Sequence, residues 1–311
     1  MQAARFVFEE IVRVTRVSLS LPLVAALALA IIAPASAAAA QDDPVKRGEY
    51  LLKAGGCITC HTAKDGTPLA GGRPFKTPFG TFYSPNITPD NETGIGRWSD
   101  EQFYRALHDG ERPDGTHYFP VFPYPTYTRM TRADAVAIKA YLFSRPAAKQ
   151  ANRPHSLPPV VGWRVLQSGW KFLYFTPAEF KADPAQPTAI NRGAYLVTAL
   201  AHCGECHTPR NAFGALDLTR ALAGTTDGPG GERVPNITPD AETGIGQWSE
   251  GDIVQVLKTG LKPDYDAVGG SMGEAVNDGL QHLTDDDLKA IAAYLKTVPA
   301  VKNAVKAAPK K

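Results

Sequence analysis

The chain has 311 residues, of which 43% are hydrophobic and 21% are charged, a composition typical of globular domains. Its 33 Lys and Arg nearly balance its 31 Asp and Glu, so it lacks the basic excess of a nucleic-acid-binding protein, and no nucleic acid partner is expected. No segment after residue 33 is long and apolar enough to span a bilayer. Membrane contact of the mature chain is therefore expected to be peripheral or through a partner.

The N-terminus has the features of an export signal. Three arginines precede a mostly apolar run over residues 17–33, and small residues at 35–40 offer cleavage sites. We expect residues 1–40 to be a cleaved signal peptide, leaving a periplasmic chain that begins near Gln41. The alternative is an uncleaved anchor, because 17 residues are at the short limit for spanning a bilayer.

Two pentapeptides, at residues 57–61 and 203–207, have the pattern C-x-x-C-H that attaches haem covalently. Each copy predicts one haem c, so the expected cofactors are two covalently bound haems c. The two thiols of a copy form thioethers with the porphyrin, and the adjacent imidazole binds the iron. The expected attachment residues are Cys57, Cys60, Cys203 and Cys206, and the expected proximal ligands are His61 and His207.

Paired cysteines also occur in zinc sites and in redox dithiols, and both alternatives were weighed. A zinc ribbon spaces its pairs by roughly 15–20 residues, whereas these pairs lie 146 positions apart. A redox dithiol does not require His at the next position. The two motifs use all four cysteines of the chain, which leaves none for a disulfide or a nucleophile.

The chain repeats itself around the two motifs. Residues 47–51 (RGEYL) recur as residues 192–196 (RGAYL), and Asn-Ile-Thr-Pro-Asp recurs at residues 86–90 and 236–240. The repeat predicts two domains of one kind. We place the first at 41–144, a linker at 145–188, the second at 189–300, and a basic tail without an assigned function at 301–311.

Four capping signals predict helices, whereas alternating strand patterns are nearly absent, so the expected fold class is all-α. The caps are Ser99, Thr131, Ser249 and Thr284, each followed three residues later by a polar partner. The helices after them are expected at residues 100–108, 132–143, 250–259 and 285–297. The last helix of each copy should pack on the first through Tyr141-Leu142 and Tyr294-Leu295.

The linker is rich in both proline and aromatic residues. Trp163, Trp170 and Phe172 belong to a patch that is too aromatic for a flexible spacer, so the linker is expected to be ordered. Two interpretations remain open. The aromatic residues either pin the two domains together or form a surface on which a partner docks.

Met130 and Met272 are the candidates for the distal iron ligands, because each follows one C-x-x-C-H motif by a similar interval. Met272 is expected in a Gly-rich loop before the final helix. Met130 is less securely placed, because the repeat aligns it with Leu283. The alternatives for the first haem are His108, His117 or an open iron. Trp98 and Trp248, and also Arg73 and Arg210, are candidate partners of haem propionates.

The phrases at residues 202–211, 235–240 and 122–125 (FPYP) resemble the multihaem cytochrome c subunits of bacterial membrane-associated dehydrogenases that oxidise alcohol, gluconate, sorbitol, fructose or aldehydes. The resemblance implies two tandem class I cytochrome c-like domains. Its best-known members carry three C-x-x-C-H motifs, whereas this chain has two. Relatives often carry Met where this chain has Phe122.

The resemblance also implies a function. It predicts an electron-transfer protein or subunit, not an enzyme, with a periplasmic or membrane-associated dehydrogenase as donor and a cytochrome or terminal oxidase as acceptor. The alternative is a dihaem peroxidase with an accessible first haem. A thiosulfate-oxidising type is disfavoured, because it resembles enzymes with a Cys ligand and this chain has no further Cys.

Overall fold

A computed structural model of the chain describes residues 43–305. The expected signal peptide and the end of the basic tail lie outside the described residues. The helices are α1 (Pro44–Ala54), α2 (Cys57–His61), α3 (Asp100–His108), α4 (Tyr124–Tyr127), α5 (Arg132–Phe143), α6 (Pro159–Gly162), α7 (Leu166–Tyr174), α8 (Thr188–Tyr195), α9 (Gly204–His207), α10 (Glu250–Thr259), α11 (Gly270–Asp278) and α12 (Asp285–Thr297). A π-helical turn, η1 (Leu196–Leu200), extends α8, and short 3₁₀ turns are η2 (Leu218–Arg220), η3 (Pro229–Gly231) and η4 (Leu280–His282).

The four helices predicted from their caps begin and end where expected, as α3, α5, α10 and α12. In each case the cap side chain accepts a hydrogen bond from the backbone N–H three residues later, as Ser99 does from Gln102 at 3.1 Å. These local signals work because a helix start leaves backbone donors without partners, and a Ser or Thr oxygen supplies one acceptor.

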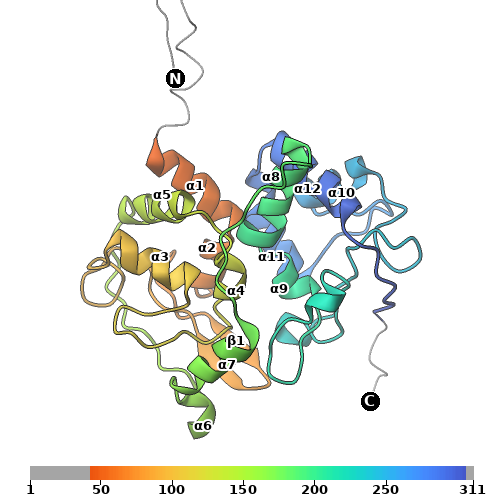
Figure 1. Cartoon of the computed structure of the whole chain (residues 1–311). Helices are drawn as coiled ribbons and strands as arrows, with labels where there is room; N and C mark the ends of the chain where they lie inside the picture. Colours follow the sequence, from red (N-terminus) through yellow and green to blue (C-terminus); the bar gives the residue numbers. More distant parts are fainter. Residues whose placement is uncertain (1–42, 306–311) are drawn as a thin grey trace, which may run out of the picture. The chain divides into compact units, whose positions relative to one another are not determined.

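The first and last helices of each copy cross closely, α1 on α5 and α8 on α12 (Figure 1). Glycine at the crossing makes this possible. A Cβ placed on Gly48 would lie 1.8 Å from the carbonyl oxygen of Ala137, and one on Gly193 would lie 2.0 Å from that of Ala290. The predicted packing of Tyr141 and Tyr294 on the first helices is confirmed, because their Cβ atoms also lie at these crossings.

The all-α prediction is wrong in one detail, because the chain also forms a small antiparallel hairpin. Strands β1 (Pro74–Thr77) and β2 (Gly80–Tyr83) pair with Thr77 opposite Gly80. The strands have four residues each and Pro78 lies in the turn between them, so the sequence shows no sustained alternation. Ser156 of the following segment bonds to Thr81 on the outer edge of β2, with N–H to carbonyl distances of 2.8 and 2.9 Å.

The repeat continues beyond the last helix of each copy. Asn86 donates its side-chain amide to the carbonyl of Ala148, and Asn236 donates in the same way to that of Val301, both at 2.7 Å. Lys302, which we expected to lie in a tail without a role, pairs with Glu242 at 2.5 Å. Residues 148–150 and 301–303 thus close the two Asn-Ile-Thr loops equivalently, although the sequence comparison ended the repeat earlier.

The segment at 145–188 contacts both copies. Trp170 donates its indole N–H to the carbonyl of Phe213 at 2.9 Å, which joins α7 to the second copy. On the first copy, Arg164 donates to the carbonyl of His117 at 2.8 Å. These contacts agree with the interpretation that the segment pins the two copies together. The outer side of α7 is exposed, and docking of a partner there stays a prediction.

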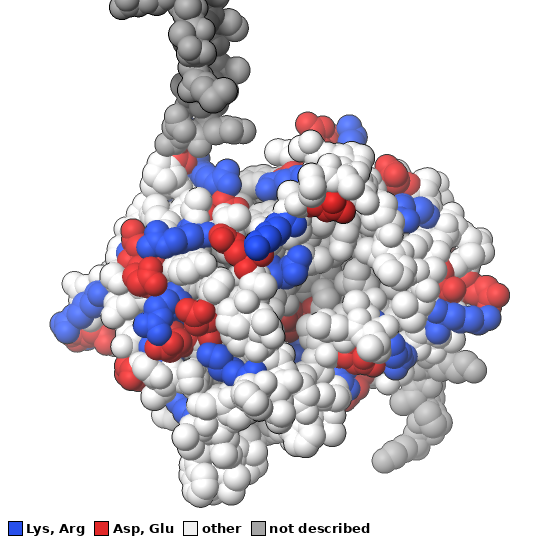
Figure 2. Space-filling model, viewed as in Figure 1, with Lys and Arg blue, Asp and Glu red and all other residues white. Residues whose placement is uncertain are grey.

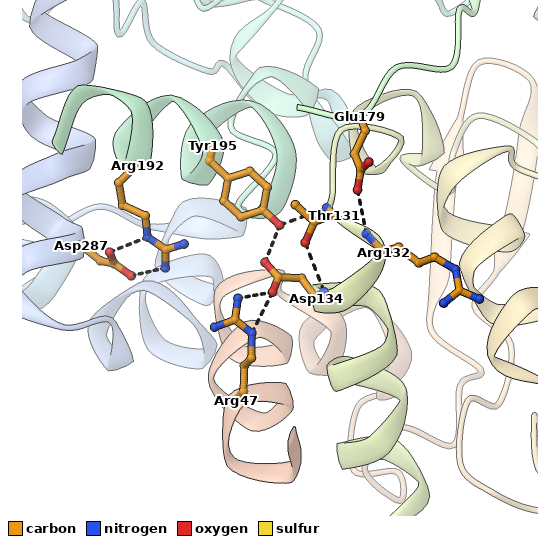
Figure 3. A network of polar contacts seen from close by, with 8 residues as sticks. All are labelled: Arg47, Thr131, Arg132, Asp134, Glu179, Arg192, Tyr195 and Asp287. Atoms are coloured by element: carbon orange, nitrogen blue, oxygen red, sulfur yellow. Dashed lines mark hydrogen bonds and ion pairs between the residues drawn. The ribbon is translucent and has the colours of Figure 1, made fainter. Parts of the chain in front are cut away.

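A polar network joins the two copies (Figure 3). The buried carboxylate of Asp134 accepts from Arg47 of its own copy at 2.9 Å and from the hydroxyl of Tyr195 in the other copy at 2.6 Å. Tyr195 also accepts from the backbone N–H of Thr131 at 3.3 Å. A tyrosine from the second copy therefore completes the hydrogen bonding of a buried carboxylate in the first.

The reciprocal network is made in the opposite direction. Asp287 accepts two hydrogen bonds from Arg192 of its own copy, at 2.8 and 2.7 Å, and one from Tyr50 of the other copy at 2.5 Å. In the repeated sequence RGxYL, Arg therefore pairs with a carboxylate of its own copy, and Gly allows the two helices to cross closely. Tyr donates a hydrogen bond to the carboxylate of the other copy. A single hydrophobic core spans both copies, so the described residues, 43–305, form one compact unit.

Adding a methyl group at a crossing should destabilise the chain. We expect Gly48→Ala to lower the free energy of unfolding by about 1–3 kcal/mol, because the new Cβ collides with backbone that cannot move aside. Denaturant unfolding of the holoprotein measures this. The matched control is Gly169→Ala on α7, where a Cβ meets nothing within 4 Å, and a neutral or slightly stabilising effect is expected. An equal loss of unfolding free energy in both variants would contradict the packing argument.

Asp287 should make the free energy of unfolding depend on pH. Burial raises the pKa of Asp287, but the hydrogen bonds from Arg192 and Tyr50 outweigh this and hold the pKa below its ordinary value of 3.8. The carboxylate therefore stabilises the fold above pH 3.8, and this contribution is lost as the pH falls toward the lowered pKa.

The denaturation midpoint should accordingly fall less steeply between neutral pH and pH 3 for Asp287→Asn than for wild type. The control is Asp286→Asn, an exposed residue of the same helical turn. An Asp287→Asn variant with the pH profile of wild type would contradict the assignment.

Candidate functional site

The two C-x-x-C-H pentapeptides occupy equivalent places after the first helix of each copy, in α2 and at α9. Sharp turns precede both. Gly56 takes the left-handed conformation with φ 62°, which glycine adopts without steric cost. The equivalent residue of the second copy is His202, at φ 42°, a strained position for a side chain. Its ring lies near the carbonyl of Gly55, with an Nε2 to O distance of 3.2 Å.

Each expected proximal histidine is held by a carbonyl oxygen. The Nδ1 of His61 lies 2.8 Å from the carbonyl of Pro85, and that of His207 lies 2.9 Å from the carbonyl of Pro235. A carbonyl only accepts, so Nδ1 must carry the proton and donate it. The Nε2 lone pair of a neutral ring then remains free for a metal, the arrangement that haem iron requires.

Burial supports the neutral form of both rings. It lowers the pKa of His61 and of His207, and this effect outweighs the opposing influence of the carbonyl hydrogen bonds. The donor set of each copy, two free thiols and one neutral imidazole with a fixed tautomer, therefore fits a covalently attached haem.

The cysteine environments do not fit the two alternatives. Burial, with a smaller contribution from the second Cys of each motif, raises the pKa of Cys57 and Cys203 to about 12. A reactive redox dithiol needs a lowered thiol pKa instead. Among residues 43–305, no group of three or more His, Cys, Asp or Glu side chains could hold a metal ion, so the two pairs do not form a four-thiolate zinc centre.

The attachment segments of the two copies touch. The carbonyl of Gly55, two residues before Cys57, lies beside the ring of His202, one residue before Cys203. The same carbonyl accepts from the hydroxyl of Tyr127 at 2.9 Å, and the Tyr127 and His202 rings meet edge to face with centroids 5.5 Å apart. The fold thus places the two expected haem attachments next to one another.

Each attachment helix is also bonded to the other copy through the residue before its second cysteine. Thr59 donates to Asp278 of α11 at 3.0 Å, and Glu205 accepts from Thr126 of α4 at 2.5 Å. Since α4 and α11 precede the last helix of their copies, each copy holds the attachment helix of the other.

The two arginines considered as propionate partners already have carboxylate partners. Arg73 pairs with Glu274 at 2.6 Å and donates to the carbonyl of Thr59 at 2.9 Å. Arg210 pairs with Glu205 at 2.6 Å. Trp98 and Trp248 pack partly buried against the core, and their contact with propionates stays a prediction.

The Gly-rich sequence predicts a loop around Met272, and this prediction is wrong: Met272 lies in the first turn of α11. Its side chain packs partly buried against the core. Met130 is 2% exposed and sits directly before the capping Thr131, the place that Leu283 takes before Thr284. Both methionines remain predicted distal ligands, and the equivalence of Met130 with Leu283 shows that a packing residue also fits that position.

The alternative histidines have other neighbours. The Nδ1 of His108 lies 2.8 Å from a carboxylate oxygen of Asp109, and its ring stacks on Tyr104. The Nδ1 of His117 lies 3.2 Å from the ammonium of Lys171 on α7. These contacts favour a structural role for both residues.

Sequence reasoning missed the second partners of the histidines and the contact between the attachment segments. One feature of the sequence could have indicated the contacts with Pro85 and Pro235: both prolines directly precede the repeated Asn-Ile-Thr loop at corresponding positions. The contact of His202 with Gly55 had none, because these residues are 147 positions apart and are not themselves repeated.

Comparison with known proteins agrees with this geometry. The cytochrome c family model matches residues 190–299, the second copy. A diheme cytochrome c-type protein of Cereibacter sphaeroides is 43% identical over 260 residues, which cover 82% of this chain and 86% of that protein. The gluconate 2-dehydrogenase cytochrome c subunit of Pantoea cypripedii is 40% identical over 84% of this chain and 61% of its own length.

The fructose dehydrogenase cytochrome subunit of Gluconobacter japonicus is 41% identical over 85% of this chain and 54% of that subunit. The chain therefore spans a little over half the length of the gluconate and fructose dehydrogenase subunits, but most of the length of the diheme protein. The resemblance predicted from the sequence motifs is confirmed.

Leucine substitutions should separate ligand from packing residue at both methionines. Leu keeps the volume of Met but has no thioether. We expect Met272→Leu and Met130→Leu each to remove one haem's share of the far-red methionine-to-iron band and to lower that haem's potential in a spectroelectrochemical titration. An unchanged spectrum and potential for Met130→Leu would show that Met130 only fills the core, as Leu283 does.

Proposed function

The chain belongs to the c-type cytochrome family that includes diheme cytochrome c and the cytochrome c subunits of dehydrogenases, and we propose that it passes electrons from a partner dehydrogenase through two covalently bound haems c. It is an electron-transfer protein and not an enzyme. The names of the relatives support a dehydrogenase as donor. We further propose a cytochrome or terminal oxidase as acceptor and a periplasmic location.

One observation carries the proposal: the attachment segments of the two copies are in direct contact. Electron transfer between cofactors weakens steeply with separation, so the arrangement of the polypeptide around the haems decides whether they exchange electrons. Gly55, Tyr127 and His202 bring the two segments together with hydrogen bonds and ring contacts. A chain built for two independent haems would not need this contact.

The residues of the chain supply attachment, ligation and a rigid frame. A bound haem supplies reversible one-electron chemistry at its iron. His61 and His207 are held in one tautomer and orientation by Pro85 and Pro235. The cross-copy hydrogen bonds of Tyr50 and Tyr195 fix the orientation of the copies. A rigid frame suits electron transfer, because little must reorganise when the charge changes.

We propose that the two copies are tandem class I cytochrome c-like domains. The family match to residues 190–299 supports the second of them. The recurrence of the caps, the glycine crossings and the histidine-to-carbonyl contacts supports the first. The peroxidase alternative gains no support from the relatives compared above, whose names are those of cytochromes or dehydrogenase subunits.

Haem content tests the proposal directly. We expect holoprotein made with a haem-maturation system to contain about two haems per chain in a pyridine haemochrome assay, because each copy has a complete donor set. Cys203→Ala/Cys206→Ala should contain about one, and so should Cys57→Ala/Cys60→Ala. These two variants serve as matched controls for one another.

Electron exchange between the haems is tested on the same preparations. Less than one equivalent of photoreduced flavin mononucleotide should reduce the wild-type haems and be followed by redistribution between them, a phase that both one-haem variants lack. A wild-type chain with one haem, or with no redistribution despite different haem potentials, would contradict the proposal.

A further inference from the structure

The two copies share one backbone path in the turn that follows α3 and α10. Tyr118 donates its backbone N–H to the carbonyl of Gly110 at 2.9 Å, and Val268 donates in the same way to that of Gly260 at 2.8 Å. An isolated β-bridge also closes each turn at the same place. The residues of the two copies therefore correspond one to one as far as Tyr118 and Val268.

Four residues beyond this turn, the first copy has Phe122 and the second has Met272. The two segments still begin alike. The carbonyl of Phe119 accepts from the backbone N–H of Phe122 at 3.0 Å, and the corresponding carbonyl of Gly269 accepts from Gly273 at 3.1 Å. Phe122 thus stands at the position of Met272. A thioether binds haem iron, whereas a phenyl ring has no donor atom for it.

The rings beside Phe122 do not replace the missing thioether. They are Tyr118 and Tyr127, with centroids 5.1 and 5.9 Å from that of Phe122. Tyrosine is a ligand of haem iron in its ionised form. Burial raises the pKa of Tyr118 to about 12 and that of Tyr127 well above its ordinary value of 10. Tyr127 also donates its hydroxyl to the carbonyl of Gly55, so both rings stay neutral near pH 7.

Met130, the predicted distal ligand of the first haem, is placed differently from Met272. It is 2% exposed, donates its backbone N–H to the carbonyl of Tyr127 at 2.8 Å, and directly precedes the cap Thr131. Leu283 has this place in the second copy. A side chain packed like a core leucine gives up close contacts when it turns toward a metal. We therefore expect the bond from Met130 to be weaker than that from Met272.

The surroundings of Phe122 suit a small uncharged ligand. The nearby side chains of Phe119 and Tyr127 are buried, whereas Val121, next to Phe122, is 40% exposed, so this segment lies between core and solvent. An ion would lose its hydration among these rings without gaining a charged partner. Figure 2 shows basic and acidic side chains interspersed on the visible face, so no patch of one sign attracts ions there.

We propose that Phe122 leaves the distal position of the first haem open to a small uncharged diatomic molecule such as carbon monoxide, whereas Met272 closes that of the second. Such a molecule binds reduced haem iron without transfer of an electron, and in the first copy it displaces only the bond from Met130. The inference rests on the proposed function, because it requires a haem in each copy and a donor that reduces the first.

Titration of the dithionite-reduced holoprotein with carbon monoxide tests the proposal, with the Soret difference spectrum as readout. We expect wild type to bind about one carbon monoxide per chain, because only one of its two haems has an exchangeable distal ligand. Cys203→Ala/Cys206→Ala, which keeps the first attachment site, should bind carbon monoxide. Cys57→Ala/Cys60→Ala, which keeps the second, should not.

A reciprocal exchange assigns the effect to one position. Phe122→Met supplies a thioether where the second copy has one and should abolish binding, whereas Met272→Phe should raise it to about two carbon monoxide molecules per chain. The matched control is Phe143→Met at the end of α5, where the ring lies 4.0 Å from the Lys139 ammonium. This control should bind as wild type does.

Wild type that contains two haems but binds no carbon monoxide overturns the proposal, and so does Phe122→Met with the binding of wild type. Haem content and electron redistribution, measured on the same preparations, separate this failure from that of the proposed function. Two haems that exchange electrons but bind no carbon monoxide overturn this inference alone. A wild-type chain with a single haem overturns both.

Discussion

Two buried carboxylates hold the molecule together. Asp134 and Asp287 each begin a last helix, and each accepts from an arginine of its own copy and a tyrosine of the other. A buried carboxylate is costly unless its oxygens are paired, so neither copy satisfies its own polar groups alone. This mutual requirement explains why the copies share one hydrophobic core and form one compact unit.

The same exchange is repeated lower in the structure, where the haems are expected to attach. Thr59 and Glu205 occupy the same place in their pentapeptides, and each bonds to the segment before the last helix of the other copy. The partners, Asp278 and Thr126, lie on α11 and α4. Those segments are also the ones on or beside which the predicted distal methionines lie. The segment on or beside which one copy's predicted distal ligand lies is therefore in contact with the attachment helix of the other copy.

Local chemistry explains how much could be predicted from the sequence. A cap or a C-x-x-C-H pentapeptide acts over a few residues. The helices after Ser99 and Ser249, and the positions of the cysteines after the first helices, can therefore be predicted from neighbouring residues. The hairpin at 74–83 escaped prediction because its strands have four residues each and a proline at the turn. Its pairing with Ser156 depends on a contact across more than 70 positions. Repetition revealed that residues 47–51 and 192–196 matter, but only the fold shows that their tyrosines cross to the other copy.

The two copies differ most between the loop and the last helix, and this difference assigns them different surroundings. In the second copy the interval holds α11, whose Glu274 and Asp278 face the first attachment helix with negative charge. In the first copy it holds the shorter α4, whose Thr126 and Tyr127 contact the second attachment segment without charge, so the charge there comes from Glu205 on the attachment helix itself. Negative charge near an iron stabilises its oxidised state, and an arginine close by opposes this effect. Arg73 neutralises Glu274 and Arg210 neutralises Glu205. Asp278, which accepts from Thr59 of the first attachment helix, forms no ion pair within residues 43–305, so the two copies differ in local charge. A potential difference between the two haems is therefore expected to come from Asp278 as well as from their distal ligands.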